Sequence, residues 1–200
     1  MHQPAIFKFR YLLANHLKGA TMNSKRYSKS AICLHWLMFL LLAAVYGFIE
    51  FRELFPKGTD PRELMKTIHF MLGLSVLLLV SFRIFTRLTN AIPPIEPKLP
   101  SWQKIASALM HSLLYVWMVA MPILGWLVLS AADKPIPFFG LELPALVGAD
   151  KETAKSLKEI HELLGVTGYW LIGLHVLAAM FHHFIKRDNT LVRMLPARKA

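Results

Sequence analysis

Residues 160–185 read IHELLGVTGYWLIGLHVLAAMFHHFI, a segment apolar enough to cross a membrane that still carries histidines at positions 161, 175, 182 and 183. An ionisable side chain inside a membrane span is costly and by default indicates a functional site. Fourteen residues of α-helix rise by about 21 Å and turn by roughly 1400°, close to a whole number of turns. His161 and His175 are therefore predicted to lie on one helix face, at two depths of a hydrocarbon core about 30 Å thick. This pattern is typical of a helix that stands between two stacked metal centres.

The composition places the chain among integral membrane proteins. Of its 200 residues, 55% are hydrophobic, and the mean hydropathy is +0.44, whereas a soluble domain is about 45–50% apolar. The single cysteine, Cys33, excludes an internal disulfide and the Cys-x-x-Cys-His attachment of a c-type haem. The net charge of +11 comes from basic residues that flank apolar segments, as orientation signals do, and does not indicate nucleic-acid binding.

Three more apolar segments, at about 31–51, 67–88 and 102–129, precede the fourth, which ends at 186–187. They predict an all-α membrane protein, a four-transmembrane-helix bundle in one domain, 31–187. Residues 1–30 are expected to form a cytoplasmic N-terminal arm, in which Met22 offers a second start that would make 1–21 an over-extension. Residues 188–200 are expected to form a basic cytoplasmic tail. A kink is expected at Pro122 and Gly125, and the polar run 149–159 is expected to begin the fourth helix.

The distribution of charge predicts the orientation. Four spans place both termini on one side, and that side carries 15 of the 23 basic residues and 2 of the 12 acidic ones. The positive-inside rule then places both termini in the cytoplasm and the two long loops outside.

The histidines fall at two depths of this topology. His35 and His175 lie in the cytoplasmic half, whereas His69 and His161 lie near the outer face, and each pair is divided between two helices. Two imidazoles opposed across a flat macrocycle are what bis-histidine haem ligation needs, and bundle cores commonly hold such cofactors. The pattern predicts two haem groups, one at each depth.

Other interpretations remain for these side chains. A lone membrane histidine often forms an interhelical hydrogen bond, and zinc or copper sites or a histidine proton relay would also use imidazole. His111 lies at cytoplasmic depth and is an alternative to His35 or His175. His182 and His183 are expected at the headgroup level, with an interfacial role favoured over proton delivery.

Two lysines precede the outer histidines by three residues, Lys66 before His69 and Lys158 before His161. This spacing puts each lysine beside its histidine on one helix face. The pattern is compatible with partners for the anionic haem propionates, and equally with lysines that reach out of the membrane toward water.

Several separated stretches resemble the bacterial cytochrome b561 family over about 25–196. They are HWLMFLLL (35–42), EFRELFPKG (50–58), KTIHFMLGLSVLLLVSFRIFTRL (66–88), PPIEPKLP (93–100), HELLGVTGYWLIGLHVLAAMFHHF (161–184) and KRDNTLVRMLP (186–196). The wider group includes the dihaem cytochrome b subunits of formate dehydrogenase and nickel–iron hydrogenase. The resemblance implies two haem b groups, with His35 and His175 as axial iron ligands of the cytoplasmic one and His69 and His161 of the outer one.

The resemblance also implies an activity and a location. Members of the family are described as superoxide oxidases, which oxidise superoxide at the periplasmic face of the bacterial inner membrane and reduce ubiquinone. Membrane lipid, superoxide and a quinone are thus the expected partners. Eight cations on the outer side could steer a small anion, although ten carboxylates share that side; these cations are Arg52, Lys57, Arg62, Lys66, Lys134, Lys151, Lys155 and Lys158.

Two alternative functions remain at this point. One is a membrane anchor and electron conduit for a partner dehydrogenase or hydrogenase, which an associated iron–sulfur subunit would identify. The other is a haem-free, histidine-rich transporter or metal carrier, which would give a colourless preparation.

Overall fold

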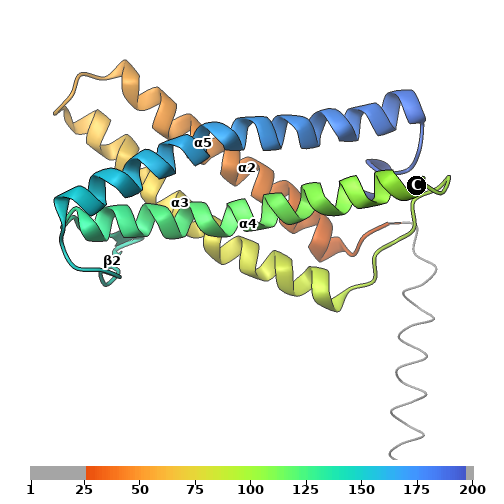
Figure 1. The fold of residues 1–200 in the computed structure, drawn as a ribbon, viewed down its shortest axis with the longest axis horizontal. Coiled ribbons are helices and arrows are strands. Elements are labelled where there is room, and N and C mark those ends of the chain that lie inside the picture. The colour runs from red at the N-terminus through yellow and green to blue at the C-terminus, as the bar shows by residue number, and fades with distance from the viewer. Residues whose placement is uncertain (1–25, 197–200) are drawn as a thin grey trace, which may run out of the picture.

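The computed structural model describes residues 26–196, so most of the expected N-terminal arm (1–25) and the last four tail residues lie outside the described part. Four long helices run side by side (Figure 1): α2 (Lys29–Phe51), α3 (Asp60–Thr89), α4 (Ser101–Ala131) and α5 (Lys151–Met180). Each is long and apolar enough to cross a membrane. The predicted all-α bundle of four transmembrane helices is confirmed.

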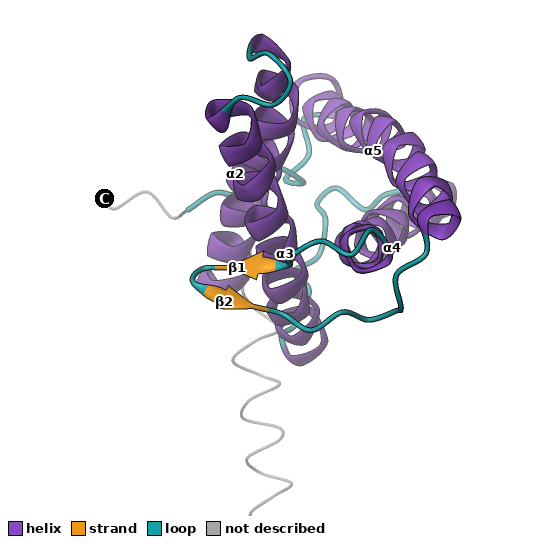
Figure 2. Cartoon of the chain, turned by 90° about the vertical axis from the view of Figure 1, so that its left-hand side faces the viewer, coloured by secondary structure: helices purple, strands orange, loops and turns teal. Residues whose placement is uncertain are grey.

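Short elements join and end these helices. A 3-10 turn, η1 (Arg52–Leu54), follows α2, and the strands β1 (Pro137–Phe138) and β2 (Leu141–Glu142) form a small antiparallel hairpin between α4 and α5. Figure 2 shows this hairpin at one end of the bundle, beside α3. After α5 the chain continues as a π-helical turn, η2 (Phe181–Lys186), and a 3-10 turn, η3 (Val192–Met194).

One helix, α3, begins earlier than the apolar pattern predicts, because a polar first turn extends it beyond the apolar band. α3 begins at Asp60 with a proline in its first turn, a position that suits proline because its missing N–H is not needed there. α5 begins at Lys151, as predicted from the polar run, and the Asp150 side chain accepts a hydrogen bond from the Thr153 amide at 2.7 Å. Pro122 lies inside α4 without ending that helix.

The apolar core lies among the first three spans. Met38, Val76, Val80, Trp117 and Met118 form its buried cluster. α2 packs against α3, α3 against α4, and α4 against α5. Within the described residues, α5 has no extensive backbone contact with α2 or α3, and Gly168 is its one buried residue. Side chains rather than closely packed backbones therefore span the space between α5 and the α2–α3 pair.

The midpoint of α5 is held by two aromatic side chains. Tyr46 of α2 donates a hydrogen bond to the Gly165 carbonyl at 2.6 Å, and Trp117 of α4 donates one to the Leu164 carbonyl at 2.9 Å. Their rings lie nearly parallel, inclined at 5°. A Cβ atom on Gly168 would collide with the Tyr46 hydroxyl and the Trp117 indole. Only glycine fits at this contact.

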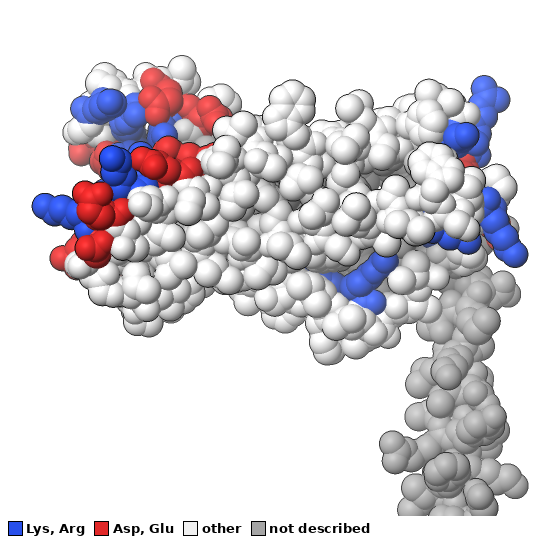
Figure 3. All heavy atoms as spheres, in the orientation of Figure 1, with Lys and Arg blue, Asp and Glu red and all other residues white. Residues whose placement is uncertain are grey.

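Charge marks the two ends of the bundle. In Figure 3 the middle of the visible face is almost free of charged side chains, one end mixes acidic and basic groups, and the other end is mainly basic. Arg62 is buried at the mixed end, where it donates to both Glu53 carboxylate oxygens at 2.8 and 2.9 Å and to the Phe55 carbonyl at 2.8 Å. These bonds close the connection between α2 and α3.

Hydrogen bonds hold the segment after α5 against the basic end of the bundle. Asn189 donates its amide to the Glu96 carbonyl, and its side chain accepts from the Glu96 amide at 2.9 Å. Trp36 donates to the Met194 carbonyl at 2.8 Å. The buried Asp188 carboxylate accepts from the Thr190 amide at 2.8 Å and pairs with His182 Nδ1 at 2.5 Å. His182, expected at the headgroup level, thus takes part in a closing contact of the fold.

We predict that Asp188→Asn lowers thermal stability at pH 7. Burial alone would raise the pKa of Asp188, but hydrogen bonds from Thr190 and His182 outweigh it and hold this pKa below its ordinary value. A carboxylate with a lowered folded-state pKa stabilises the fold above its unfolded pKa of about 4, and the contribution is lost as the pH falls through the folded value. Thermal unfolding in detergent should show a cost of about 1–3 kcal/mol at pH 7 that shrinks toward pH 3.

The control for Asp188→Asn is Glu96→Gln. Glu96 is exposed at the same face and meets Asn189 through its backbone, so its neutralisation should change little. A deficit in Asp188→Asn that is the same at both pH values would contradict the charge argument.

We also predict that Gly168→Ala destabilises the bundle. The added methyl group must displace both Tyr46 and Trp117, and overpacking of this kind costs about 1–3 kcal/mol. The intrinsic gain of alanine over glycine in a helix, about 1 kcal/mol, offsets only part of this. Gly47→Ala is the matched control, because its methyl would make an ordinary 3.7 Å contact with Phe51. Equal melting temperatures for the two variants would show that the close contact at Gly168 has no energetic weight.

Candidate functional site

The four histidines predicted as iron ligands meet in two pairs. His35 of α2 faces His175 of α5 with 6.3 Å between ring centres, and His69 of α3 faces His161 of α5 with 6.4 Å. The rings within the pairs are inclined at 70° and 88°. The structure thus pairs the same histidines that were predicted to pair from their depths in the membrane. Their role as iron ligands stays a prediction.

The ring separation can be compared with that of two imidazoles on one metal ion. A metal–imidazole bond is about 2 Å long and the ring centre lies about 1 Å beyond the nitrogen, so two ligands on opposite sides place their ring centres about 6 Å apart. Both pairs have this separation. Direct hydrogen bonding or stacking of the imidazoles would not require it.

His111 of α4 is a third histidine at the inner pair. Its ring centre lies 5.3 Å from that of His175, closer than two ligands across one iron would stand. Its Nδ1 lies 2.6 Å from the carbonyl of Ser107 on its own helix. The spacing favours His35 over His111 as the partner of His175.

Hydrogen bonds orient the outer pair. Nδ1 of His69 lies 2.9 Å from the Val45 carbonyl, which can only accept, so Nδ1 carries the proton and Nε2 keeps its lone pair. A backbone carbonyl in this position is a usual partner of a metal-binding histidine. Nδ1 of His161 is buried.

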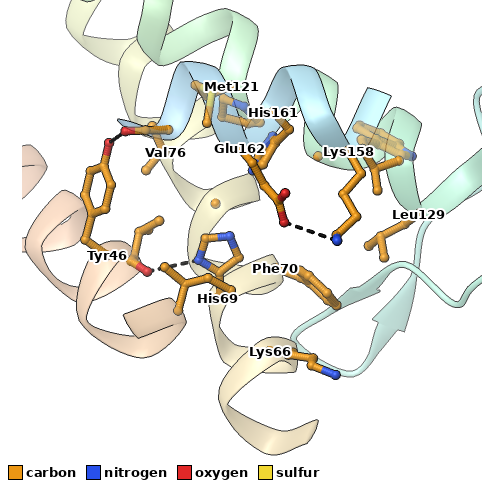
Figure 4. A pocket seen from close by; sticks show the side chains of 18 of the residues that line it. Tyr46, Lys66, His69, Phe70, Val76, Met121, Leu129, Lys158, His161 and Glu162 are labelled. Atoms are coloured by element: carbon orange, nitrogen blue, oxygen red, sulfur yellow. Dashed lines mark hydrogen bonds and ion pairs between the residues drawn. The ribbon is translucent and has the colours of Figure 1, made fainter. Parts of the chain in front are cut away.

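The outer pair faces a cavity of about 640 Å³, within the range of about 300–1,000 Å³ typical of ligand and cofactor sites. In Figure 4, His69 and His161 project into it from opposite sides, with Phe70, Val76 and Leu129 among the apolar side chains around them. Tyr46 and Trp117, which hold the midpoint of α5, also line it.

Two glycines shape the wall of this cavity. A Cβ on Gly125 of α4 would lie 3.3 Å from Cε1 of His161, so glycine leaves room for that ring. A Cβ on Gly73 of α3, one turn beyond His69, would meet nothing within 4 Å. An apolar cavity with opposed imidazoles at metal-binding separation fits a haem, and His69 and His161 are the residues that would hold its iron.

The two lysines predicted near the outer pair are engaged by carboxylates of their own helices. Lys66 donates to Glu63 at 2.6 Å, and Lys158 pairs with Glu162 at 3.2 Å. Both lysines line the cavity, as Figure 4 shows. A second hollow of about 430 Å³ lies beside it, lined by Arg52, Glu53, Lys57, Arg62, Lys66 and Lys158.

Sequence reasoning missed two residues at the sites. Trp117 stands at the midpoint between the pairs, since Gly168, which it contacts, is seven residues from both His161 and His175. Arg83 enters the inner pair, with Nη2 2.8 Å from His35 Nδ1. Its signal was available, because Arg83 follows His69 by fourteen residues on α3, the same spacing as His161 and His175 on α5.

Comparisons with known proteins agree with this architecture. The model of the family described as prokaryotic cytochrome b561 matches residues 26–197. "Cytochrome b561 homolog 1" of Escherichia coli is 39% identical over 174 residues, which cover 87% of this chain and 99% of that protein. "Probable superoxide oxidase CybB" of Yersinia pestis is 39% identical over 176 residues, covering 88% and 98%.

A more distant relative, "Cytochrome b561 homolog 2" of Escherichia coli, is 25% identical over 176 residues, which cover 88% of this chain and 94% of that protein. The resemblance found in the sequence is thereby confirmed. With four apolar helices and a family match over its whole described length, the chain belongs to the prokaryotic cytochrome b561 family, a group of multi-pass bacterial membrane proteins that carry b-type haem.

Proposed function

We propose that this protein is a dihaem b cytochrome that oxidises superoxide at the periplasmic face of the inner membrane and reduces ubiquinone. His69 and His161 are the proposed ligands of the outer haem iron, and His35 and His175 of the inner one. The observation that carries the proposal is the separation of 6.3 and 6.4 Å between facing rings, which matches two imidazoles on one metal ion. When bound, haem supplies reversible one-electron chemistry.

The overall reaction balances in electrons and protons. Two superoxide anions lose one electron each and leave as dioxygen. One ubiquinone gains these two electrons and takes up two protons to become ubiquinol. The contribution of the chain is to hold two redox centres at different depths, and α5 does so with His161 and His175 on one face.

The border of the outer cavity, rather than the outer end as a whole, suits a small anion. The larger cavity is bordered by Lys66, Lys134, Lys155 and Lys158 as well as by the carboxylates of Glu50, Glu53 and Glu162. Lys134 and Lys155 form no ion pair within residues 26–196. Unpaired cations at the mouth of a site raise the local concentration of an anionic substrate. The name of the relative from Yersinia pestis points to the same substrate.

The charge pattern supports the orientation that this reaction needs. The end with α2's first turn and the segment after α5 is mainly basic, as Figure 3 shows, and the positive-inside rule places it in the cytoplasm. The cavity of the outer histidine pair then lies toward the periplasm. Both chain termini lie on the cytoplasmic side in this arrangement.

The ligand assignment predicts distinct spectra for two variants. His161→Ala should remove the outer haem and His175→Ala the inner one, each leaving about half of the haem-to-protein ratio and one set of absorption bands. A lost cofactor should also lower the melting temperature, because a bound ligand stabilises the native state. His111→Ala is the control and should keep both haems. If His175→Ala kept both haems and His111→Ala lost the inner one, His111 rather than His175 would be the ligand of the inner haem.

The substrate assignment predicts that a superoxide flux reduces the haem bands of the purified protein and that added ubiquinone reoxidises them. Raising the ionic strength from about 0.01 to 0.15 M should slow the reduction, because salt screens the attraction between exposed cations and an anion. Lys134→Gln combined with Lys155→Gln should reduce this salt dependence.

Haem bands that stay oxidised under superoxide would reject the donor. If an iron–sulfur subunit then co-purified and restored reduction, the protein would be an electron conduit for a partner enzyme.

A further inference from the structure

The hairpin of β1 and β2 carries large apolar side chains at its tip that the fold leaves uncovered. Phe139 in the turn and Leu141 beside it are 63% and 66% exposed. The charged residue of the hairpin, Glu142, stands one pair back from the tip, opposite Pro137. Figure 2 views the bundle from its mixed-charge end and shows the hairpin extending sideways beside α3. Exposed apolar side chains grouped in this way mark an interaction surface.

The opposite face of the hairpin segment packs against the membrane-spanning part of the bundle. Ile136 is 2% exposed and forms a buried cluster with Leu74 of α3 and Leu129 of α4. Phe138 packs against this cluster, as does Phe70 of α3. The hairpin therefore folds back along the side of the bundle and does not stand free above it.

The contacts on α3 give the depth of the hairpin. The sequence of α3 has no charged residue between Lys66 and Arg83, an interval of about 25 Å along the helix. Leu74, at the hairpin, lies about 12 Å beyond Lys66, in the outer half of this apolar interval. Residues 65–77 of α3 are all buried or half-buried, whereas exposed apolar side chains recur from Leu78 onward. The hairpin thus helps to cover the outer half of α3, and lipid covers the inner half.

The backbone of this segment suits a place with little water. A backbone N–H without a partner is costly in the apolar part of a membrane. Three residues here lack that group because they are prolines: Pro135, Pro137 and Pro144. Of the others, Leu143 donates its amide to the Ile136 carbonyl at 2.9 Å. The Trp126 indole of α4 donates to the Pro144 carbonyl at 2.9 Å, which ties the end of the segment to the bundle.

We propose that the tip of this hairpin inserts into the outer leaflet of the bilayer and anchors the loop between α4 and α5 there. Phe139 and Leu141 contact the acyl chains close to the headgroups, a zone in which aromatic side chains are favoured. Glu142 stays at headgroup level. This contact extends the lipid-facing surface of α3 sideways, and it is independent of the proposed function.

The anchor has a consequence for the outer cavity. Lys134 and Ile136, just before β1, both line that cavity. A tip held by lipid therefore fixes one part of the cavity wall. The loop acts in this way as an interfacial element of the membrane protein and not as a free connection in water.

The test places a fluorescent NBD label at the tip of the full-length protein in phosphatidylcholine vesicles. Cys33, the single cysteine of the sequence, is first replaced by serine, and the label is attached to Phe139→Cys. Lipid with a nitroxide near the headgroup end of its acyl chain should quench this label, whereas iodide in the water should have little effect.

Ala149→Cys is the matched control, because Ala149 is exposed in the same loop, beside the polar first turn of α5. Its label should be quenched by iodide and little by the lipid nitroxide. We expect lipid quenching to be at least about twofold stronger at position 139 than at position 149. Both labels lie on one side of the membrane, so mixed orientation in the vesicles affects them equally.

Two results would overturn the inference. Iodide quenching at position 139 as strong as at position 149 would place the tip in water. Protection of position 139 from both quenchers would show that a second copy or another protein covers the tip in place of lipid. If Phe139→Cys does not fold, Leu141→Cys carries the label instead, and the same pattern is expected there.

Discussion

The distance between facing imidazoles is the constraint on which the rest of this bundle depends. Ring centres 6.3 and 6.4 Å apart match the separation of two imidazoles on opposite sides of one metal ion. To hold side chains at that distance, α5 must stand off from α2 and α3 while it packs against α4. Tyr46 and Trp117 meet this need at the midpoint of α5, where Gly168 allows the closest approach.

The two ends of the bundle differ in how their charged side chains are paired. The outer end holds many ionic groups of both signs, and two of the four lysines at its cavity, Lys66 and Lys158, are matched by glutamates. The inner end places one arginine among imidazoles without a described carboxylate partner. Far from water, an uncompensated charge has more influence on its surroundings than a matched pair does. The asymmetry gives the four-helix scaffold a polarity that its similar histidine pairs do not have.

Much of this architecture could be predicted from the sequence. Long apolar segments with basic flanks are a strong signal for membrane helices, and the fourteen-residue interval between His161 and His175 placed both rings on one helix face. The beginning of α3 was less accurate, because its polar first turn from Asp60 extends the helix beyond the apolar pattern on which the boundary rested. The hairpin of 137–142 is too short to leave a periodic signal.

Those features of the site that depend on tertiary contacts could not be predicted from the sequence. Histidine depth could suggest pairs, but not that Val45 would orient one ring or that Arg83 would reach another. In the sequence, Arg83 is one of several basic residues near the end of an apolar segment, and Trp117 is one of many apolar residues inside another. The carboxylate partners of Lys66 and Lys158 were close in sequence, yet only side-chain conformation shows that the lysines turn toward them.

The position of α5 after the other three long helices has a consequence for how the protein is made. Chains emerge from the ribosome N-terminus first, so α2, α3 and α4 are synthesised before the helix that carries one member of each histidine pair. Neither histidine pair exists in a nascent chain shorter than 161 residues. The hydrogen bonds between Asn189 and Glu96 and between Trp36 and Met194 form later still, after residues 189 and 194 have been made. A cofactor that needs both members of a pair can bind only after α5 has been made, and a chain that stops before α5 carries only one histidine of each pair.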